Sequence, residues 1–358
     1  MIPVPLLDVR ALRVDYFRNG RRIPAVRHVT FSLSRGESLG IAGESGSGKS
    51  TLAQSLLRLL PESAEIRAAG LFFDGQDVLA LGKPALRALR GGPVGIVFQD
   101  PFSALNPVLS VGEQVEEVLE IHAGGRHRER VLSLFEKVRL PDPSGIYGAY
   151  PHQLSGGQRQ RICLAMAMAG SPKLLIADEP TTALDVTVQR DILNLLDELR
   201  RDFNMALLLV THNVGLLSER TDRLAIMYAG EIVEMGPTST VLGSPAHPYT
   251  QGLLKSLPRL NRKDRRLPAL AGQPPDPRDL PTGCPFRPRC PKAFDVCATT
   301  DPVLRPRTDL VPVAGGPGDQ NSDQDKSAGG HGKRGSTEFS GPTDSVVHVA
   351  CHLYGEPL

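Results

Sequence analysis

The sequence has little that would place it in a membrane, outside the cell or on nucleic acid. No stretch of its 358 residues approaches 18 consecutive apolar residues, so we find no candidate for a membrane-spanning helix. The start of the chain, Met1–Pro5, lacks the charged and then apolar pattern of a secretory signal, so we expect a cytoplasmic protein. A net charge of +2 gives no indication of a nucleic-acid partner.

The length and the local composition predict a large domain with an appendage. Residues 6–237 alternate short apolar runs with helical patterns, as an α/β domain does. Proline and arginine become frequent in residues 238–310, which excludes long helices there. Residues 311–345 are mostly Gly, Ser, Asp, Gln and Lys, which predicts a disordered insertion, and the tail 346–358 turns apolar again.

The α/β region contains several recognisable elements. Short apolar runs predict strands at Ser38–Ala42, Val94–Phe98, Leu174–Asp178, Ala206–Thr211 and Leu224–Tyr228. Apolar residues recur at helical spacing within Gln189–Arg201, and a helix is expected from Ser50 onward.

A glycine-rich loop follows the first of these predicted strands and fits the phosphate-binding pattern G-x-x-x-x-G-K-[ST]. Glycines let the backbone curl so that many N–H groups converge on a phosphate, and the following helix presents its positive end. Lys49 would reach the β and γ phosphates, and the Ser50 hydroxyl would occupy one Mg²⁺ position. A chance glycine-rich turn is the alternative, although the flanking strand and helix oppose it. The predicted ATP-binding residues of this loop are Gly43, Glu44, Ser45, Gly46, Ser47, Gly48, Lys49, Ser50 and Thr51.

Two carboxylates stand at the end of the predicted strand Leu174–Asp178: Asp178 is its last residue and Glu179 follows directly. Asp178 would hold Mg²⁺, which needs hard oxygen ligands, and Glu179 would polarise the attacking water. Acidic residues also commonly form turns at strand ends, so the pair is informative mainly because a phosphate-binding loop precedes it.

A short motif between the glycine-rich loop and the Asp178–Glu179 pair is more specific than either of them. Its residues are Leu154, Ser155, Gly156, Gly157 and Gln158. Ser155 and the glycines would form a backbone nest at a helix start that can hold a γ-phosphate, whereas a plain serine N-cap is the structural alternative. With this motif the chain resembles the ATP-binding cassette family over about residues 6–237. The resemblance implies an α/β P-loop NTPase fold with a RecA-like core, an antiparallel β subdomain and a helical signature subdomain, followed by a loop-rich extension.

The resemblance also implies that two subunits clamp ATP between them, so that Ser155 contacts a nucleotide held by the opposite subunit. Gln99 matches the family's Q-loop and would help to hold Mg²⁺ with Ser50 and Asp178. Asp185 matches the D-loop and His212 the switch histidine, beside the catalytic Glu179. Tyr16 occupies the place of the adenine-stacking aromatic, although Phe17 could serve instead. Asn213 departs from the family pattern, where aspartate usually follows the histidine, and the insertion before Ser345 is longer than usual.

Longer strings are similar to the peptide and nickel importer branch. They include Tyr150–Arg161, Ala177–Thr187 and His247–Thr250. This resemblance implies an ATPase subunit at the cytoplasmic face of the membrane, with a second homologous ATPase, two permease subunits and an extracytoplasmic substrate-binding protein as partners. We expect di- or oligopeptides as the substrate. Nickel or another small solute, and a soluble ABC ATPase without a transport role, remain as alternatives.

Four of the five cysteines cluster late in the chain, at Cys284, Cys290, Cys297 and Cys351. They resemble a cysteine motif that holds a 4Fe-4S cluster in some members of this branch. Zinc and unligated thiols remain as alternatives, because the spacing contains no C-x-x-C. Cys163 stands apart and is expected to pack within a helix.

Overall fold

The computed structural model describes residues 4–182, 184–256, 270–307 and 346–354. These residues form two compact units that divide between Ile232 and Val233. The expected insertion at 311–345 and the end of the tail lie outside the described residues. Within the described ranges, no helix is both long and apolar enough to cross a membrane.

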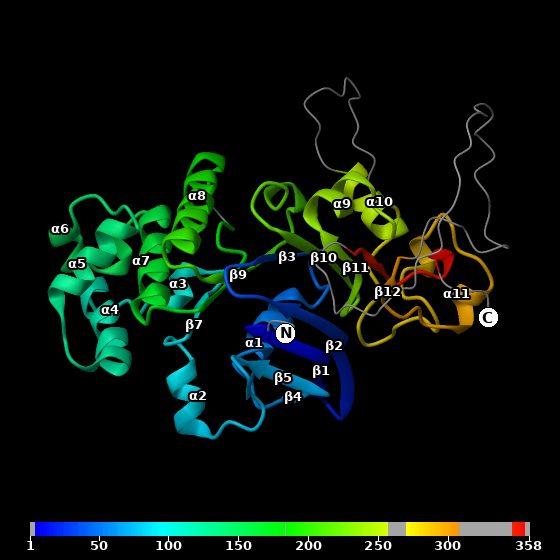
Figure 1. Cartoon of the computed structure of the whole chain (residues 1–358), viewed down its shortest axis with the longest axis horizontal. Coiled ribbons are helices and arrows are strands. Elements are labelled where there is room, and N and C mark those ends of the chain that lie inside the picture. Colours follow the sequence, from blue (N-terminus) through cyan, green and yellow to red (C-terminus); the bar gives the residue numbers. More distant parts are fainter. Residues whose placement is uncertain (1–3, 183, 257–269, 308–345, 355–358) are drawn as a thin grey trace, which may run out of the picture. The chain divides into compact units, whose positions relative to one another are not determined.

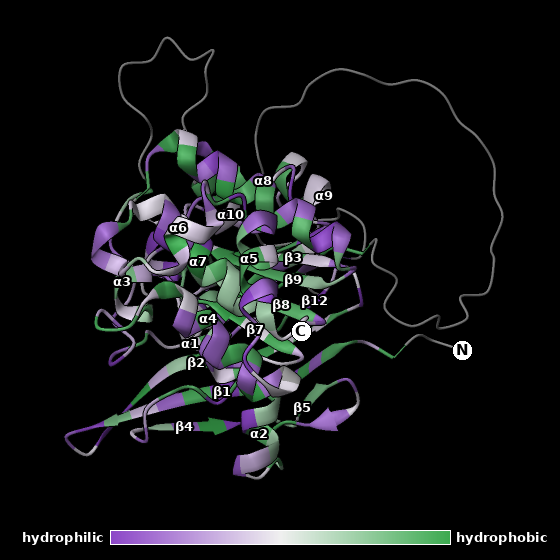
Figure 2. Ribbon diagram, turned by 90° about the vertical axis from the view of Figure 1, so that its left-hand side faces the viewer, coloured by the Kyte–Doolittle hydropathy of each residue, from purple (hydrophilic) through white to green (hydrophobic). Residues whose placement is uncertain are grey.

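A parallel β-sheet forms the centre of the first unit (Figure 1). Its strands, in spatial order, are β10 (Arg223–Tyr228), β3 (Ser38–Ala42), β9 (Ala206–Thr211), β8 (Leu174–Asp178) and β7 (Val94–Val97). Every residue of β3, β8 and β9 is buried, because helices and loops cover both faces of such a sheet. Figure 2 accordingly colours these strands toward the hydrophobic end of its scale. All five predicted strands are confirmed, with shifts of one residue at the start of β10 and at the end of β7.

An antiparallel sheet packs beside this core. Its strands are β2 (Arg21–Leu33), β1 (Leu7–Arg18), β5 (Gly70–Phe73) and β6 (Gln76–Asp77), and β4 (Ala64–Arg67) pairs with the far end of β1. Helix α1 (Lys49–Ser55) contacts strands of both sheets. The loop that precedes α1 therefore lies where the two sheets meet.

A group of helices lies between β7 and β8 in the sequence. It comprises α3 (Pro101–Ala104), α4 (Val111–Leu119), η1 (Glu120–Gly124), α5 (Arg128–Lys137), α6 (Pro143–Tyr147), η2 (Pro151–Gln153) and α7 (Gly156–Ala169). Fully buried Phe135 and Leu119 belong to its core, and Figure 1 shows α4 to α7 gathered on the side of β7. The expected helix at Gln189–Arg201 is confirmed within α8 (Val186–Asp202), which buries Ile192, Leu195, Leu196 and Leu199.

The second unit contains only short elements, as its prolines predict. They are the C-terminal part of β11 (Glu231–Pro237), α9 (Thr238–Gly243), α10 (Pro248–Lys255), η4 (Arg287–Arg289), α11 (Val296–Thr299), β12 (Arg305–Pro306), β13 (His348–Val349) and η5 (His352–Tyr354). Strand β13 pairs antiparallel with both β11 and β12. The tail after residue 345 therefore returns to this unit and brings Cys351 with it.

A buried polar group fixes the start of α10 in the second unit. The Glu234 carboxylate accepts hydrogen bonds from the backbone N–H groups of Ala246 (2.7 Å) and His247 (3.0 Å). The His247 Nδ1 atom accepts from the Tyr249 N–H, and complete burial lowers the pKa of His247 to about 3. His247 is therefore a neutral structural residue, and the Tyr249 and Phe286 rings pack edge to face beside it.

Candidate nucleotide site

The glycine-rich loop between β3 and α1 has a backbone that only glycine fits. A Cβ atom at Gly43 would lie 2.1 Å from the Met227 carbonyl oxygen, and one at Gly48 would lie 2.3 Å from that of Ala25. Gly46 and Gly48 also have positive φ angles of 80° and 100°. The backbone at Gly43 and Gly48 therefore packs directly against other main-chain carbonyl groups, and a residue with a side chain would not fit at either position.

Lys49 is almost fully buried at the start of α1. Its Nζ donates to the carbonyl oxygens of Gly43 and Glu44, both at 2.9 Å, so the ammonium group spans its own loop. Burial lowers the pKa of Lys49, and the nearby Glu179, Asp178 and Glu44 carboxylates oppose that change. The loop therefore concentrates a cation at its centre.

Ser50 and Asp178 meet next to this lysine. The Ser50 hydroxyl donates to Asp178 Oδ1 at 2.9 Å, although the two residues are 128 positions apart. Burial is the main reason why the pKa of Asp178 rises to about 6. These two predicted Mg²⁺ ligands are therefore brought together by the parallel arrangement of β3 and β8.

The three predicted catalytic residues come together at Glu179. One carboxylate oxygen, Oε2, accepts from Gln99 Nε2 at 3.2 Å, and the other, Oε1, lies 3.2 Å from His212 Nδ1. Glu179 has a positive φ of 47°, and its N–H donates to the Val210 carbonyl, which fixes this uncommon conformation. The ends of β7, β8 and β9 therefore bring Gln99, Glu179 and His212 to one point.

Thr182 belongs to this cluster and was not predicted. Its hydroxyl donates to Glu179 Oε2 at 2.9 Å. A threonine three residues after a glutamate at a strand end can reach back across a turn, and here the Thr182 N–H closes the turn by donating to the Glu179 carbonyl. That spacing is the only signal in the sequence that could have identified it.

The predicted signature residues start helix α7. The Ser155 hydroxyl accepts from the Gln158 N–H, and the Gln158 side chain accepts from the Ser155 N–H at 2.8 Å, which forms a complete capping box. Gly157 cannot carry a side chain cheaply, because its Cβ would lie 2.9 Å from Val188. In the described part of the chain, no hydrogen bond joins Ser155 to the loop that holds Lys49.

The remaining predicted residues lie on the same unit. Asp185 caps α8 by accepting from the Thr187 and Val188 N–H groups. The D-loop residue before it, Ala183, lies outside the described residues. Tyr16 is half-buried on β1, paired with β2 and β4, whereas 47% of the neighbouring Phe17 side chain is exposed. Asn213 accepts from the Gly215 N–H and so caps a short turn after His212.

The four late cysteines surround one narrow cavity in the second unit, lined also by His247, Pro248, Phe286, Arg287, Lys292, Phe294, His352 and Leu353. The Cys284 N–H donates to the Cys297 carbonyl at 2.9 Å, and this hydrogen bond joins the two segments that carry these cysteines. Burial raises the pKa of Cys284 to about 11 and that of Cys351 to about 12. Among the described residues, no group of three or more His, Cys, Asp or Glu side chains is arranged to hold a metal ion.

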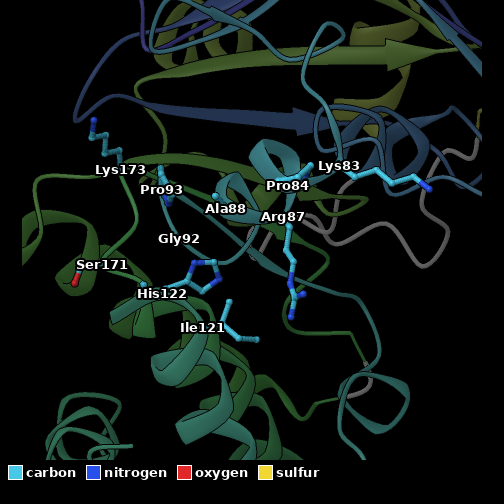
Figure 3. A pocket seen from close by; sticks show the side chains of 11 residues that line it. Lys83, Pro84, Arg87, Ala88, Gly92, Pro93, Ile121, His122, Ser171 and Lys173 are labelled. Atoms are coloured by element: carbon cyan, nitrogen blue, oxygen red, sulfur yellow. The ribbon is translucent and has the colours of Figure 1, made fainter. Parts of the chain in front are cut away.

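A larger hollow, of about 830 Å³, contains none of the predicted site residues. It is lined by α2 (Lys83–Leu89), by the residues before β7 and β8, and by Ile121 and His122 of η1 (Figure 3). Its cations do not converge: Lys83 extends away from His122, and Lys173 is paired with Asp74 at 2.6 Å. His122 is half-buried, and burial lowers its pKa. This hollow therefore adds no residue to the predicted nucleotide site.

Comparison with known proteins places both parts of the chain. Residues 26–182 match the family described as ABC transporter, and residues 233–297 match the family described as oligopeptide/dipeptide transporter, C-terminal region. A putative peptide import ATP-binding protein of Brucella abortus (strain 2308) is 47% identical over 303 residues, covering 84% of this chain and 91% of the relative. The dipeptide transport ATP-binding protein DppD of Escherichia coli (strain K12) is 44% identical over 302 residues, covering 84% and 92%.

Solved structures resemble about two thirds of the chain. The ATP-binding cassette MJ0796, in a dimeric post-hydrolysis state bound to ADP and Pi, has a TM-score of 0.59 at 28% identity and covers 65% of this chain and 98% of its own. The structure of cbiO1 from Clostridium perfringens, part of the ABC transporter complex cbiONQ, has a TM-score of 0.57 at 26% identity and covers 68% and 92%.

Proposed function

The chain belongs to the ABC transporter family, in its oligopeptide/dipeptide branch, and we propose that it works as one of two facing ATPase subunits of a peptide importer. The predicted family, the ABC ATPase fold and the role of an ATP-binding subunit are confirmed by the matching families and relatives.

One observation carries the proposed chemistry. The Glu179 carboxylate is held by Gln99, Thr182 and His212, close to the Ser50–Asp178 pair and to the Lys49 ammonium. A carboxylate fixed in this way can orient a water molecule and accept its proton as the water attacks the γ-phosphate. The glycine-rich loop and Lys49 would hold the phosphates and stabilise the charge that develops on them.

The residues around Asp178 fit a magnesium site. Ser50, Asp178 and Gln99 offer hydroxyl, carboxylate and amide oxygens, which are hard ligands, and Mg²⁺ usually takes only one or two carboxylates beside substrate phosphates and water. Bound there, Mg²⁺ would neutralise charge on the β and γ phosphates. Asp178 is the carboxylate that would hold it, and Ser50 keeps Asp178 oriented.

We further propose that Ser155 acts on a nucleotide held by the facing subunit. Its hydroxyl and the start of α7 form an exposed N-terminal nest, whose hydrogen bonds stay within the capping box. The resembling cassette MJ0796 is a dimer bound to ADP and Pi. This chain would thus supply Lys49 to one nucleotide and Ser155 to the other.

The proposed partners are a second homologous ATPase, two permease subunits and an extracytoplasmic binding protein, with this chain at the cytoplasmic face of the membrane. The support is the high similarity to the dipeptide transport protein DppD and to putative peptide import proteins. Nickel or another small solute is the alternative cargo. A soluble ABC ATPase without a transport role is the less favoured alternative, because the second unit matches a transporter-specific region.

Reconstitution tests this proposal directly. In proteoliposomes that contain the chain with its permeases and second ATPase, we expect binding protein loaded with a dipeptide to raise ATP hydrolysis several-fold and to drive dipeptide uptake. Binding protein loaded with nickel, and empty binding protein, are the controls. Stimulation by nickel alone would assign the alternative cargo, and ATP hydrolysis that no cargo stimulates would contradict an importer.

We also propose that Cys284, Cys290, Cys297 and Cys351 ligate a 4Fe-4S cluster. The support is the chemistry of the donors: four thiols around one cavity suit such a cluster, and bound iron would favour the thiolate forms that burial now disfavours. The side chains would have to spread, since the cavity is narrow and they form no metal-holding group as they stand. Zinc and free thiols are the alternatives.

Metal analysis after anaerobic purification decides among these. We expect about four iron and four sulfide per chain, and a loss of most of both in Cys284→Ser. Cys163→Ala is the matched control, because Cys163 is a buried residue of α7 in the other unit. About one zinc per chain would support the zinc alternative. Protein that contains no iron and no zinc would contradict ligation.

A further inference from the structure

Arg159 joins the signature helix to the segment that follows Gln99. Arg159 lies in the first turn of α7, directly after Gln158, and its guanidinium carbon is 3.6 Å from the centroid of the Phe102 ring. Its Nη1 also donates to the Pro151 carbonyl, just before the signature, at 3.3 Å. Arg159 therefore connects the start of α7 and the residues leading into it with Phe102.

Phe102 is fixed to Gln99 through a compact turn. Asp100 caps α3 by accepting from the Phe102 N–H at 2.9 Å, and the Ser103 hydroxyl donates to the Asp100 carbonyl at 3.0 Å. Gln99 itself donates to Glu179. A displacement of Gln99 at the nucleotide site would consequently move the Phe102 ring.

The stacking geometry is what holds Arg159 in this place. Among the described residues, the Arg159 Nε atom is buried without a hydrogen-bond partner, so hydrogen bonding alone does not explain the orientation of the guanidinium. A planar guanidinium over an aromatic face is a favourable cation–π contact, and a flexible ammonium reproduces it only in part. Phe102 is 63% exposed, so few other contacts compete to hold its ring.

These contacts form a continuous chain from Glu179 through Gln99, the Asp100 turn and Phe102 to Arg159 and the signature. We propose that Arg159 is a positioning residue that couples the two nucleotide sites of the ATPase dimer. Through Phe102, it links the state of the chain's own site, sensed by Gln99, to the placement of Ser155 at the other site. This inference rests on the proposed function, in which Ser155 serves the facing subunit.

The test measures ATP hydrolysis by the assembled transporter as a function of ATP concentration. For Arg159→Met and Phe102→Leu, we expect the Hill coefficient to fall toward 1 and kcat to fall about three- to tenfold, as a lost cation–π contact allows. The double variant should be no worse than either single one, because both remove the same contact. Phe102→Tyr should retain the wild-type Hill coefficient, since it keeps the ring, and Arg159→Lys should retain part of it.

Arg161→Met is the matched control, because this arginine of the same helix donates to the Val138 carbonyl instead. Its Hill coefficient should stay at the wild-type value, and thermal unfolding of every variant shows whether the fold is intact. Unchanged cooperativity in Arg159→Met, or losses that add in the double variant, would overturn this inference alone. A wild-type transporter without cooperativity would overturn it together with the facing-subunit arrangement.

Discussion

Glu179→Gln is expected to reduce ATP turnover by roughly 100-fold or more, while ATP binding persists. The amide keeps the shape of the side chain and can still meet Gln99 and Thr182, but it cannot accept a proton from the attacking water. Lys49 and the glycine-rich loop are untouched, so the affinity for ATP should change little. Steady-state phosphate release and equilibrium nucleotide binding, measured on the same assembled transporter, check the two halves of this expectation.

Two further variants separate chemistry from general damage. Glu198→Gln removes a surface carboxylate of α8 that pairs with Arg139, and it should hydrolyse ATP at the wild-type rate. Thr182→Val removes one hydrogen bond from Glu179. Its rate of ATP hydrolysis should fall between those of Glu198→Gln and Glu179→Gln. Turnover close to the wild-type rate in Glu179→Gln would refute the role assigned to this carboxylate.

Ser155→Asp is expected to lower the rate of ATP hydrolysis by the dimer roughly 100-fold or more. This loss is as large as that expected for Glu179→Gln, but it has a different cause. Aspartate caps a helix as well as serine does, so α7 should still begin at its normal position. Its negative charge, however, would face the γ-phosphate of the nucleotide on the other subunit. ATP binding to the isolated chain should survive, because Lys49 and its loop remain intact.

Ser155→Asn is the matched control for that charge. Asparagine has nearly the same shape as aspartate and is an equally good N-cap. The rate of ATP hydrolysis in Ser155→Asn should therefore fall by less than about tenfold. Phosphate release by the dimer and nucleotide binding by the isolated chain distinguish the two. An equal loss in both variants would mean that the shape of the capping box matters rather than charge beside a phosphate, and undiminished hydrolysis in Ser155→Asp would contradict any contact with the nucleotide.

The parallel core and its nucleotide loop could be predicted because local sequence determines them. Buried parallel strands such as β3 and β8 are continuous apolar runs, and the loop before Lys49 needs glycines at fixed positions. The order of motifs along the chain then indicated which distant residues would meet, and Ser50 and Asp178 do so.

Other features depend on tertiary contacts that have no local signal. Thr182 reaches Glu179 only because Glu179 adopts a positive φ, and the Phe102–Arg159 contact requires α3 and α7 to pack together. The sequence alone does not decide whether Tyr16 or Phe17 stacks on adenine, because neighbouring side chains of a strand point to opposite faces and either face could meet the base. In the structure Phe17 is the more exposed of the two.

The most direct test of the whole account is the structure of the assembled Glu179→Gln transporter with ATP and Mg²⁺. The account predicts that each γ-phosphate is contacted by the lysine of one subunit's glycine-rich loop and by the signature serine of the facing subunit, so that this chain supplies Lys49 to one nucleotide and Ser155 to the other. A triphosphate enclosed by a single subunit, with Ser155 out of reach of any phosphate, would contradict it.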